Sequence, residues 1–120
     1  MATKLEVIRE HWDRIEAEIV DCYKHSAKWG GRVGYLVYIW EDGEFETWEL
    51  TPGSHGVLKP KEAETRQLYD LTWVHANVDD DVEDEEEMEL LLDWFREEQL
   101  WQYMEEIEIN AKREEEDNAY

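Results

Sequence analysis

One cysteine and four histidines are the residues of this chain best suited to nucleophilic catalysis. A thiolate beside an imidazole base can attack a carbonyl carbon, so Cys22 could pair with one of the histidines, which are His11, His25, His55 and His75. The histidines are scattered, and no glycine-rich phosphate loop, H-E-x-x-H, C-x-x-C or G-x-S-x-G motif is present. A lone cysteine on an amphipathic segment usually serves as a small buried hydrophobic residue. We therefore expect the protein not to be an enzyme.

One run of acidic and amide side chains has the alternating spacing of a calcium-binding loop, and it consists of Asn77, Asp79, Asp81 and Glu83. An EF-hand needs glycine at its sixth position and glutamate at its twelfth, where this chain has Val82 and Met88. His55 and His75 could ligate zinc with a nearby aspartate, but two histidines so far apart in the sequence are an unspecific signal. We expect neither a dedicated metal site nor a cofactor.

Acidic residues are concentrated in the last third of the chain. Residues 79–120 contain 19 acidic residues against three basic ones and so carry −16 of the net charge of −21, whereas residues 1–78 contain 14 acidic and nine basic residues. Adaptation to high salt would spread the acidic residues over the whole surface, so their uneven distribution indicates a local purpose. This charge repels phosphate groups, which excludes direct binding to nucleic acid or to anionic membranes.

Large hydrophobic side chains lie inside the acidic segment, which a merely solvating tail would lack. They are Leu90, Leu91, Leu92, Trp94, Phe95, Trp101 and Tyr103. Carboxylates steer a basic protein towards such a surface, and exposed aromatic side chains anchor it there. We therefore predict that a basic protein partner is contacted by Asp79, Asp80, Asp81, Glu83, Asp84, Glu85, Glu86, Glu87, Trp94, Glu97, Glu98, Trp101, Tyr103 and Glu105.

The spacing of the charges would allow this segment to occupy part of a nucleic-acid-binding groove. A duplex carries one charge per ~1.7 Å of its axis. If residues 79–120 formed one straight helix, they would extend about 63 Å and carry one net charge per ~4 Å. That spacing is sparser than in a duplex and not far from that of a single strand, so one copy cannot match a duplex charge for charge.

We expect the protein to be an inhibitor that docks on the basic cleft of a nucleic-acid-binding protein, such as a nuclease or a restriction or CRISPR effector. In composition the chain resembles small phage-encoded anti-defence proteins, which are often acidic mimics of nucleic acid. This resemblance implies a viral anti-CRISPR or anti-restriction factor acting in the host cytoplasm. No motif matches a particular family, and an immunity protein against a toxin nuclease would look nearly the same.

A non-enzymatic adaptor or assembly subunit is the alternative function. Either the hydrophobic stripe of residues 3–28 or the C-terminal helix would then pair with another chain, and a homodimer is one such arrangement. That contact would be hydrophobic and insensitive to salt, whereas an acidic inhibitor would lose affinity steeply as the salt concentration rises.

The length and composition of the chain indicate one folded domain over residues 1–120, of which 42% are hydrophobic. Cys22 has no partner for an intramolecular disulfide, which fits a reducing compartment. The N-terminus lacks a secretion signal, and the longest apolar run, Tyr35–Trp40, is far shorter than the ~20 residues of a membrane span. We therefore expect a cytoplasmic protein that does not bind membranes, with a frayed tail over residues 113–120.

Residues 3–28 are predicted to form an amphipathic helix. Its hydrophobic residues recur at spacings of three and four, at Leu5, Ile8, Trp12, Ile15, Ile19 and Cys22. Thr3 suits the N-cap with Glu6 as its capping-box partner, and Gly30-Gly31 can end the helix. We expect this stripe to pack on the domain's own sheet, with a homodimer seam as the alternative.

Residues 33–50 are predicted to form a β-hairpin, because two segments rich in β-branched and aromatic residues flank Asp42-Gly43. This dipeptide favours a two-residue type I′ turn. The expected cross-strand pairs are then Trp40 with Phe45, Tyr38 with Thr47, and Val37 with Trp48.

Residues 69–76 are predicted to add a third antiparallel strand, and Pro60 can open a short helix before it. A long acidic helix is expected to begin near Val82–Asp84 and to run towards Lys112. Its hydrophobic residues do not share one face, so it is expected to bend or break near residues 96–99. The predicted fold class is α+β, with an N-terminal helix, a three-stranded antiparallel sheet and this C-terminal helix.

Overall fold

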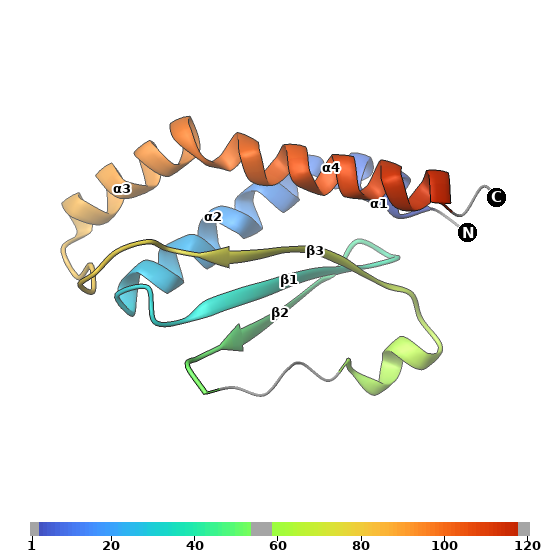
Figure 1. Ribbon diagram of the computed structural model, residues 1–120, viewed down its shortest axis with the longest axis horizontal. Helices are drawn as coiled ribbons and strands as arrows, with labels where there is room; N and C mark the ends of the chain where they lie inside the picture. Colours follow the sequence, from blue (N-terminus) through green and yellow to red (C-terminus); the bar gives the residue numbers. More distant parts are fainter. Residues whose placement is uncertain (1–2, 54–58, 118–120) are drawn as a thin grey trace.

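In the part of this protein that the structure describes, the four α-helices lie on one face of a three-stranded antiparallel sheet (Figure 1). The computed structural model describes residues 3–53 and 59–117. In chain order its elements are α1 (Lys4–Glu10), α2 (Trp12–Lys28), β1 (Gly34–Trp40), β2 (Phe45–Leu50), the 3₁₀ helix η1 (Lys61–Glu64), β3 (Leu68–His75), α3 (Glu85–Glu98) and α4 (Leu100–Asp117). The strand order is β2-β1-β3. This arrangement confirms the predicted α+β fold.

The N-terminal helix is interrupted once, at His11. The φ of −111° and ψ of 22° at His11 lie outside the helical region, but Ile15 N still donates to His11 O at 2.9 Å. The imidazole packs against Gly43 in the turn between β1 and β2, where an added Cβ would lie 2.3 Å from His11 Nε2. Two helical segments therefore replace the single helix expected over residues 3–28.

Both outer ends of the α1–α2 pair are formed as predicted. Thr3 Oγ1 accepts a hydrogen bond from Glu6 N at 3.2 Å, and Gly31 after α2 has a φ of +74°. The hydrophobic stripe is buried inside its own chain through Leu5, Ile8, Ile15, Ile19 and Cys22, while Trp12 is half-buried. Because these side chains fill the domain's own core, they are not free to form the seam of a homodimer.

The hairpin is present, but its register differs by one residue from the prediction. Trp40 N donates to Glu44 O at 2.7 Å and Gly43 N donates to Trp40 O at 2.8 Å, which closes a three-residue loop. A type I′ turn needs two residues with positive φ, and in the described chain only glycines, such as Gly43 at +93°, have one. The observed pairs are therefore Ile39 with Phe45, Tyr38 with Glu46, Val37 with Thr47 and Leu36 with Trp48.

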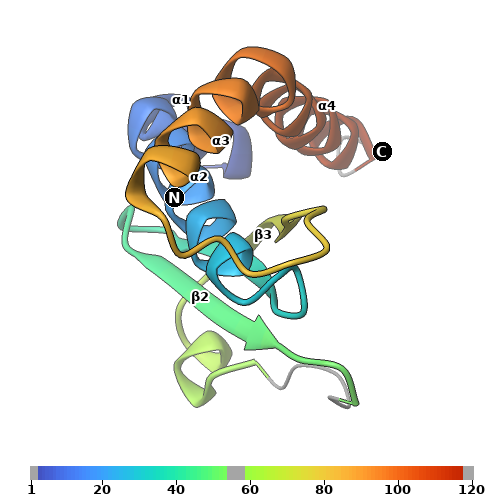
Figure 2. The same cartoon turned by 90° about the vertical axis from the view of Figure 1, so that its left-hand side faces the viewer.

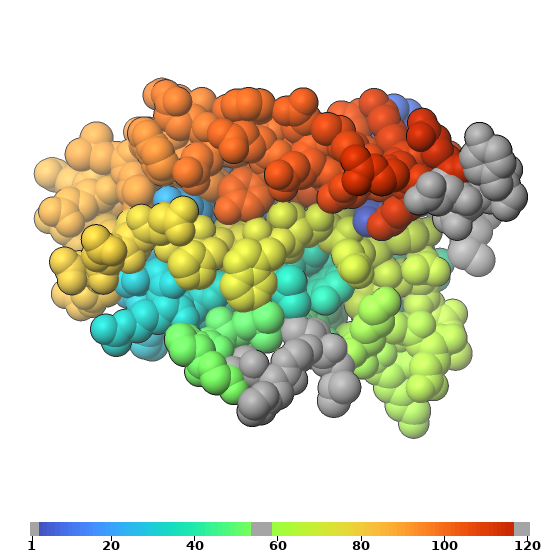
Figure 3. Space-filling view, in the orientation of Figure 1, coloured from blue at the N-terminus to red at the C-terminus, as the bar shows by residue number. Residues whose placement is uncertain are grey.

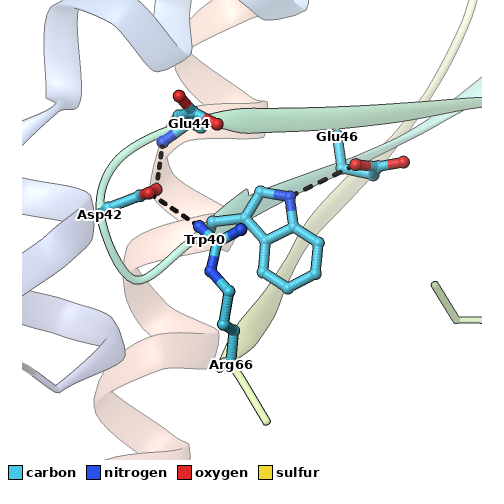
Figure 4. A network of polar contacts seen from close by, with 5 residues as sticks. All are labelled: Trp40, Asp42, Glu44, Glu46 and Arg66. Carbon is cyan, nitrogen blue, oxygen red and sulfur yellow. Dashed lines mark hydrogen bonds and ion pairs between the residues drawn. The ribbon is translucent and has the colours of Figure 1, made fainter. Parts of the chain in front are cut away.

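A polar network ties the hairpin turn to the segment before β3 (Figure 4). The guanidinium of Arg66 lies over the ring of Trp40, 4.6 Å from its centroid, and pairs with Asp42 at 2.7 Å. Asp42 Oδ1 also accepts from Glu44 N at 3.1 Å, and Trp40 Nε1 donates to Glu46 Oε2 at 3.3 Å. Asp42 thus stabilises the loop with its side chain, which a type I′ turn does not require.

β3 pairs with the free edge of β1 and contains a β-bulge. The partner of Val37 is Thr72 and that of Tyr38 is Asp70, so Leu71 has no residue opposite it. The bulge changes which side chains share a face: Leu71 and Val74 are both buried, while Trp73 is 42% exposed and its indole covers Gly34. A strict alternation along β3 would place Leu71 and Trp73 on the same face, and the bulge breaks it after Leu71.

The C-terminal helix breaks at Gln99, inside the range predicted for a bend. In α3 the buried residues are Met88, Leu92 and Phe95, and in α4 they are Leu100, Met104, Ile107 and Ala111. α2 lies between α3 and the sheet (Figure 2). The break at Gln99 allows α3 and α4 each to turn its own apolar face towards the core. α4 continues to Asp117 and thus extends into the segment expected to be frayed, of which residues 118–120 lie outside the described chain.

Within the described part of the chain, none of the helices combines the length and the apolar character needed to cross a membrane.

Candidate protein-binding surface

The candidate nucleophile Cys22 is buried against the core. Burial, reinforced by the carboxylates of Glu18 and Asp21, raises the pKa of this thiol to about 12. No hydrogen bond joins Cys22 to a histidine in the described chain, and His55 lies outside it. At neutral pH the side chain is therefore a neutral thiol that fills the core.

The alternating run from Asn77 to Glu83 is a loop without regular structure, in which Asp79, Asp81 and Glu83 are exposed. Among the residues that the structure describes, no group of three or more histidine, cysteine, aspartate or glutamate side chains is arranged to hold a metal ion. Of the two histidines considered for zinc, His75 is half-buried and His55 lies outside the described residues.

All the predicted acidic contact residues are exposed. We name these eleven carboxylates the acidic surface: Asp79, Asp80, Asp81, Glu83, Asp84, Glu85, Glu86, Glu87, Glu97, Glu98 and Glu105. Five of them belong to the loop before α3 and six to α3 and α4. These helices, drawn in orange and red, form one whole border of the molecule in Figure 3.

The loop that carries the first carboxylates is fixed to the C-terminal end of α2. Val82 is half-buried against the core, and its backbone N–H donates to Ala27 O at 3.0 Å. Beside it, an added Cβ on Gly30 would lie 3.0 Å from Asp81 N, so the two backbones are in close contact. The aspartates around Val82 therefore have a defined position in the fold.

Some carboxylates of the acidic surface stabilise the first turn of α3. Asp84 is the N-cap, and its Oδ1 accepts from Glu86 N at 2.8 Å. The carboxylates of Glu85, Glu86 and Glu87 lie in the first helical turn, where the helix dipole favours negative charge. This effect fades within one turn, so it gives no structural reason for the remaining carboxylates of the acidic surface.

None of the eleven carboxylates forms an ion pair with a base in the described chain. The bases near α3 and α4 pair with other acids: Arg96 with Asp93, Lys112 and Arg9 with Glu108, and Lys4 with Glu114. Lys28 and Arg32 line a surface hollow together with Asp79–Asp81, Glu83 and Trp29, but neither is within ion-pair distance of them. The acidic surface therefore forms no ion pair within the described chain, and the bases closest to it, Lys28 and Arg32, lie only beside its first carboxylates.

Two of the three predicted aromatic anchors are exposed. Trp94 is 45% and Trp101 is 56% exposed, and Leu90, 70% exposed, accompanies them. We name these three residues the tryptophan ridge. Trp101 Nε1 donates to Glu98 O at 3.1 Å, which fixes the orientation of its ring.

Tyr103, the third predicted anchor, turns inwards. It is half-buried and packs against Phe95 with ring centroids 5.7 Å apart. Burial raises its pKa, against the effect of a hydrogen bond with the backbone of His75. Tyr103 therefore belongs to the packing between α4, α3 and β3, and it is not an exposed anchor.

The set of residues predicted from the sequence omits two exposed hydrophobic side chains near the acidic surface. Leu90 lies four residues before Trp94, so its position on the same helix face was available as a signal. Trp29 directly precedes Gly30-Gly31 and falls outside the buried stripe of α2, which could have indicated its exposure.

Comparison of the chain with models of known protein families, with curated proteins and with solved structures finds no match in any of the three.

Proposed function

We propose that this protein inhibits a basic, nucleic-acid-binding protein by docking the acidic surface on its nucleic-acid-binding cleft. One observation supports this above all: eleven exposed carboxylates have no basic partner in the described chain and are attached to an ordered helical frame. A cleft lined with lysine and arginine side chains attracts such a surface as it attracts phosphates. Occupation of the cleft by the acidic surface then excludes the nucleic acid.

The charge of the free protein also favours binding to a basic partner. Helix capping explains the carboxylates from Asp84 to Glu87, but Asp79–Asp81, Glu97, Glu98 and Glu105 have no such role in the described contacts. Crowded like charges raise the free energy of the folded chain. A basic partner would relieve this repulsion on binding, and this relief contributes to the affinity.

This chemistry fits a phage-encoded factor against a restriction or CRISPR effector, or an immunity protein against a nuclease, acting in the cytoplasm. In each case the inhibitor must bind quickly, and electrostatic steering raises the association rate of oppositely charged proteins well above that of neutral ones.

The salt dependence of binding tests this function. The full chain, immobilised, is used to capture its partner from an extract of its source cells, and the dissociation constant of the purified pair is measured as NaCl increases. We expect the affinity to fall by at least about 10-fold when NaCl rises from about 50 to about 500 mM. Failure to capture any basic protein at low salt, or an affinity unchanged by salt, would contradict the proposal.

An adaptor or assembly subunit is the second candidate, and the exposed tryptophan ridge favours it. Leu90, Trp94 and Trp101 would fit an apolar groove of another chain, and buried area would then dominate the affinity. In this case the measured affinity would not fall with salt, so the same titration separates the two functions.

A further inference from the structure

The tryptophan ridge and the acidic surface occupy the same helices, which restricts the kind of cleft that they fit. Leu90 and Trp94 lie at positions i and i+4 on one face of α3, and Trp101 lies in the first turn of α4, directly after the break at Gln99. Glu97 and Glu98 lie between the two tryptophans in the sequence, and all four of these side chains are exposed. The partner must therefore accept large flat rings and negative charges side by side.

A duplex does not offer this combination on its surface. Its bases are stacked inside the helix, so proteins that use a whole base must first extrude it. A single strand instead presents its phosphates and the faces of its bases together. Proteins that bind single strands accordingly combine a basic groove with aromatic or apolar platforms on which the bases stack.

The charge density of α3 and α4 is also closer to that of a single strand than to that of a duplex. Residues 85–116 contain 13 acidic and three basic residues, a net charge of −10. At the rise of an α-helix these 32 residues give about 48 Å of path along α3 and α4 together, or one net charge per ~5 Å of that path. A single strand of nucleic acid carries one charge per ~3.4 Å and a duplex one per ~1.7 Å of axis. The helices thus approach the charge density of a single strand and have about a third of that of a duplex.

We propose that the cleft occupied by this protein is one that binds single-stranded nucleic acid, and that Trp94 and Trp101 take the positions of stacked bases. This inference rests on the proposed function and specifies the class of its partner. The two rings are seven residues apart and belong to different helices, Trp94 to α3 and Trp101 to α4, so they would enter separate base positions of the cleft.

Competition with nucleic acid tests the class of cleft. The complex of the full chain with its captured partner is challenged with oligo(dT) of about 20 nucleotides and with a duplex of the same length, at equal phosphate concentrations. We expect oligo(dT) to release the protein at a concentration at least about 10-fold below that of the duplex. Release by the duplex at an equal or lower concentration would overturn this inference and leave the proposed function intact. Release by neither would contradict the proposed function itself.

Substitution of the rings tests their role. Trp94→Leu and Trp101→Leu keep an apolar side chain without a ring, whereas Trp94→Phe and Trp101→Phe keep a ring. We expect each Leu variant to raise the dissociation constant about 10-fold or more, and each Phe variant to retain most of the affinity.

The matched control is Trp73→Leu, because this indole is exposed to a similar extent but lies on β3, away from the acidic surface. Its dissociation constant should equal that of the unmodified chain. Leu and Phe variants of equal affinity would overturn the stacking role of Trp94 and Trp101, since an apolar contact alone would then account for their effect.

Discussion

The rings of Tyr23 and Phe95 are stacked, with their centroids 3.9 Å apart and an angle of 15° between their planes. Tyr23 belongs to α2 and Phe95 to α3, so this contact joins the first helices of the chain to the acidic ones. On another side Phe95 contacts Tyr103 of α4. The position of the acidic surface therefore depends on one ring held between two tyrosines.

Replacement of Phe95 is expected to destabilise the whole domain. Phe95 is fully buried, and Phe95→Ala should lower the free energy of unfolding by about 3–5 kcal/mol, because it removes the stacked ring and leaves a cavity. Urea unfolding followed by circular dichroism measures this change. The neighbouring Trp94→Ala alters an exposed side chain and should cost less than about 1 kcal/mol. Equal losses in both variants would contradict the central position of Phe95.

Ser26 is a buried polar residue that joins three elements. Its hydroxyl donates to Val33 O beside β1 and accepts from Ala76 N after β3 at 3.0 Å. Ser26→Ala leaves both backbone groups without this partner and should lower the free energy of unfolding by about 1–3 kcal/mol. Thermal and urea unfolding test this value. The control is Thr65→Ala, which removes an exposed hydroxyl that makes one long hydrogen bond to Glu62 O. Its free energy of unfolding should change by no more than about 0.5 kcal/mol.

Charge reversal in the loop before α3 should abolish inhibition without unfolding the protein. Asp79, Asp80 and Asp81 are exposed and form no ion pair with a described base, so their joint replacement by lysine should change the free energy of unfolding by less than about 1 kcal/mol. The same variant should bind the basic partner at least about 100-fold more weakly, because three attractive charges become repulsive.

The matched control reverses three exposed carboxylates outside the acidic surface, those of Glu44, Glu62 and Glu64. It changes the net charge by the same amount and should retain most of the affinity. If both triple variants bound equally well, or lost affinity equally, net charge alone would govern binding and the acidic surface would not be the contact.

Glu18 should make the protein less stable at neutral pH than a neutral side chain would. Burial and the carboxylate of Asp21 raise its pKa, outweighing the opposite effects of His25 and Arg14. A carboxyl whose pKa is raised by folding binds more protons in the folded state, so stability falls as the pH rises towards and through the folded pKa. Glu18→Gln removes this loss and should raise the free energy of unfolding at pH 7.

The advantage of Glu18→Gln should shrink as the pH falls through the folded pKa and vanish below the ordinary pKa of a glutamate. Urea unfolding at neutral and acidic pH measures it. Glu10→Gln, which changes an exposed carboxylate of α1, is the control. An advantage that persisted undiminished in acid would show that the carboxylate of Glu18 is not its cause.

The sequence predicted the elements of this fold better than their registers. Hydrophobic spacing located the strands and the α-helical segments because each of these elements must bury one face, although it did not show the interruption at His11. The drift of that face after Phe95 was enough to predict the break at Gln99. The turn at Asp42-Gly43 was also correctly placed, but its loop length depends on whether Asp42 itself takes a positive φ. Asp42 accepts a local hydrogen bond from Glu44 N and is also paired with Arg66, and this second contact is tertiary.

For the candidate site, the exposure of the carboxylates was predictable, because long runs of like charge cannot be buried. The aromatic residues were harder to assign. Trp101 and Tyr103 are two residues apart on one helix, and only the position of Phe95 and His75 in three dimensions decides that Tyr103 turns inwards. The bulge at Leu71 similarly reverses the faces of Trp73 and Val74, and a β-bulge has no clear signature in this strand.

The carboxylates near the tryptophan ridge form no ion pairs in the described chain, and they should therefore control how ions quench the fluorescence of its indoles. Carboxylates concentrate cations and repel anions within a Debye length of the surface, so caesium ions should collide with the exposed indoles of Trp94 and Trp101 far more often than iodide ions do. The indole of Trp40, which is buried beneath Arg66, is shielded from both quenchers. Trp29 and Trp73 are exposed as well, so both must be replaced by phenylalanine before the emission of the ridge is followed. In that variant the sign of the quenching ion separates the ridge from the buried Trp40, which provides a label-free signal for occupancy of these helices.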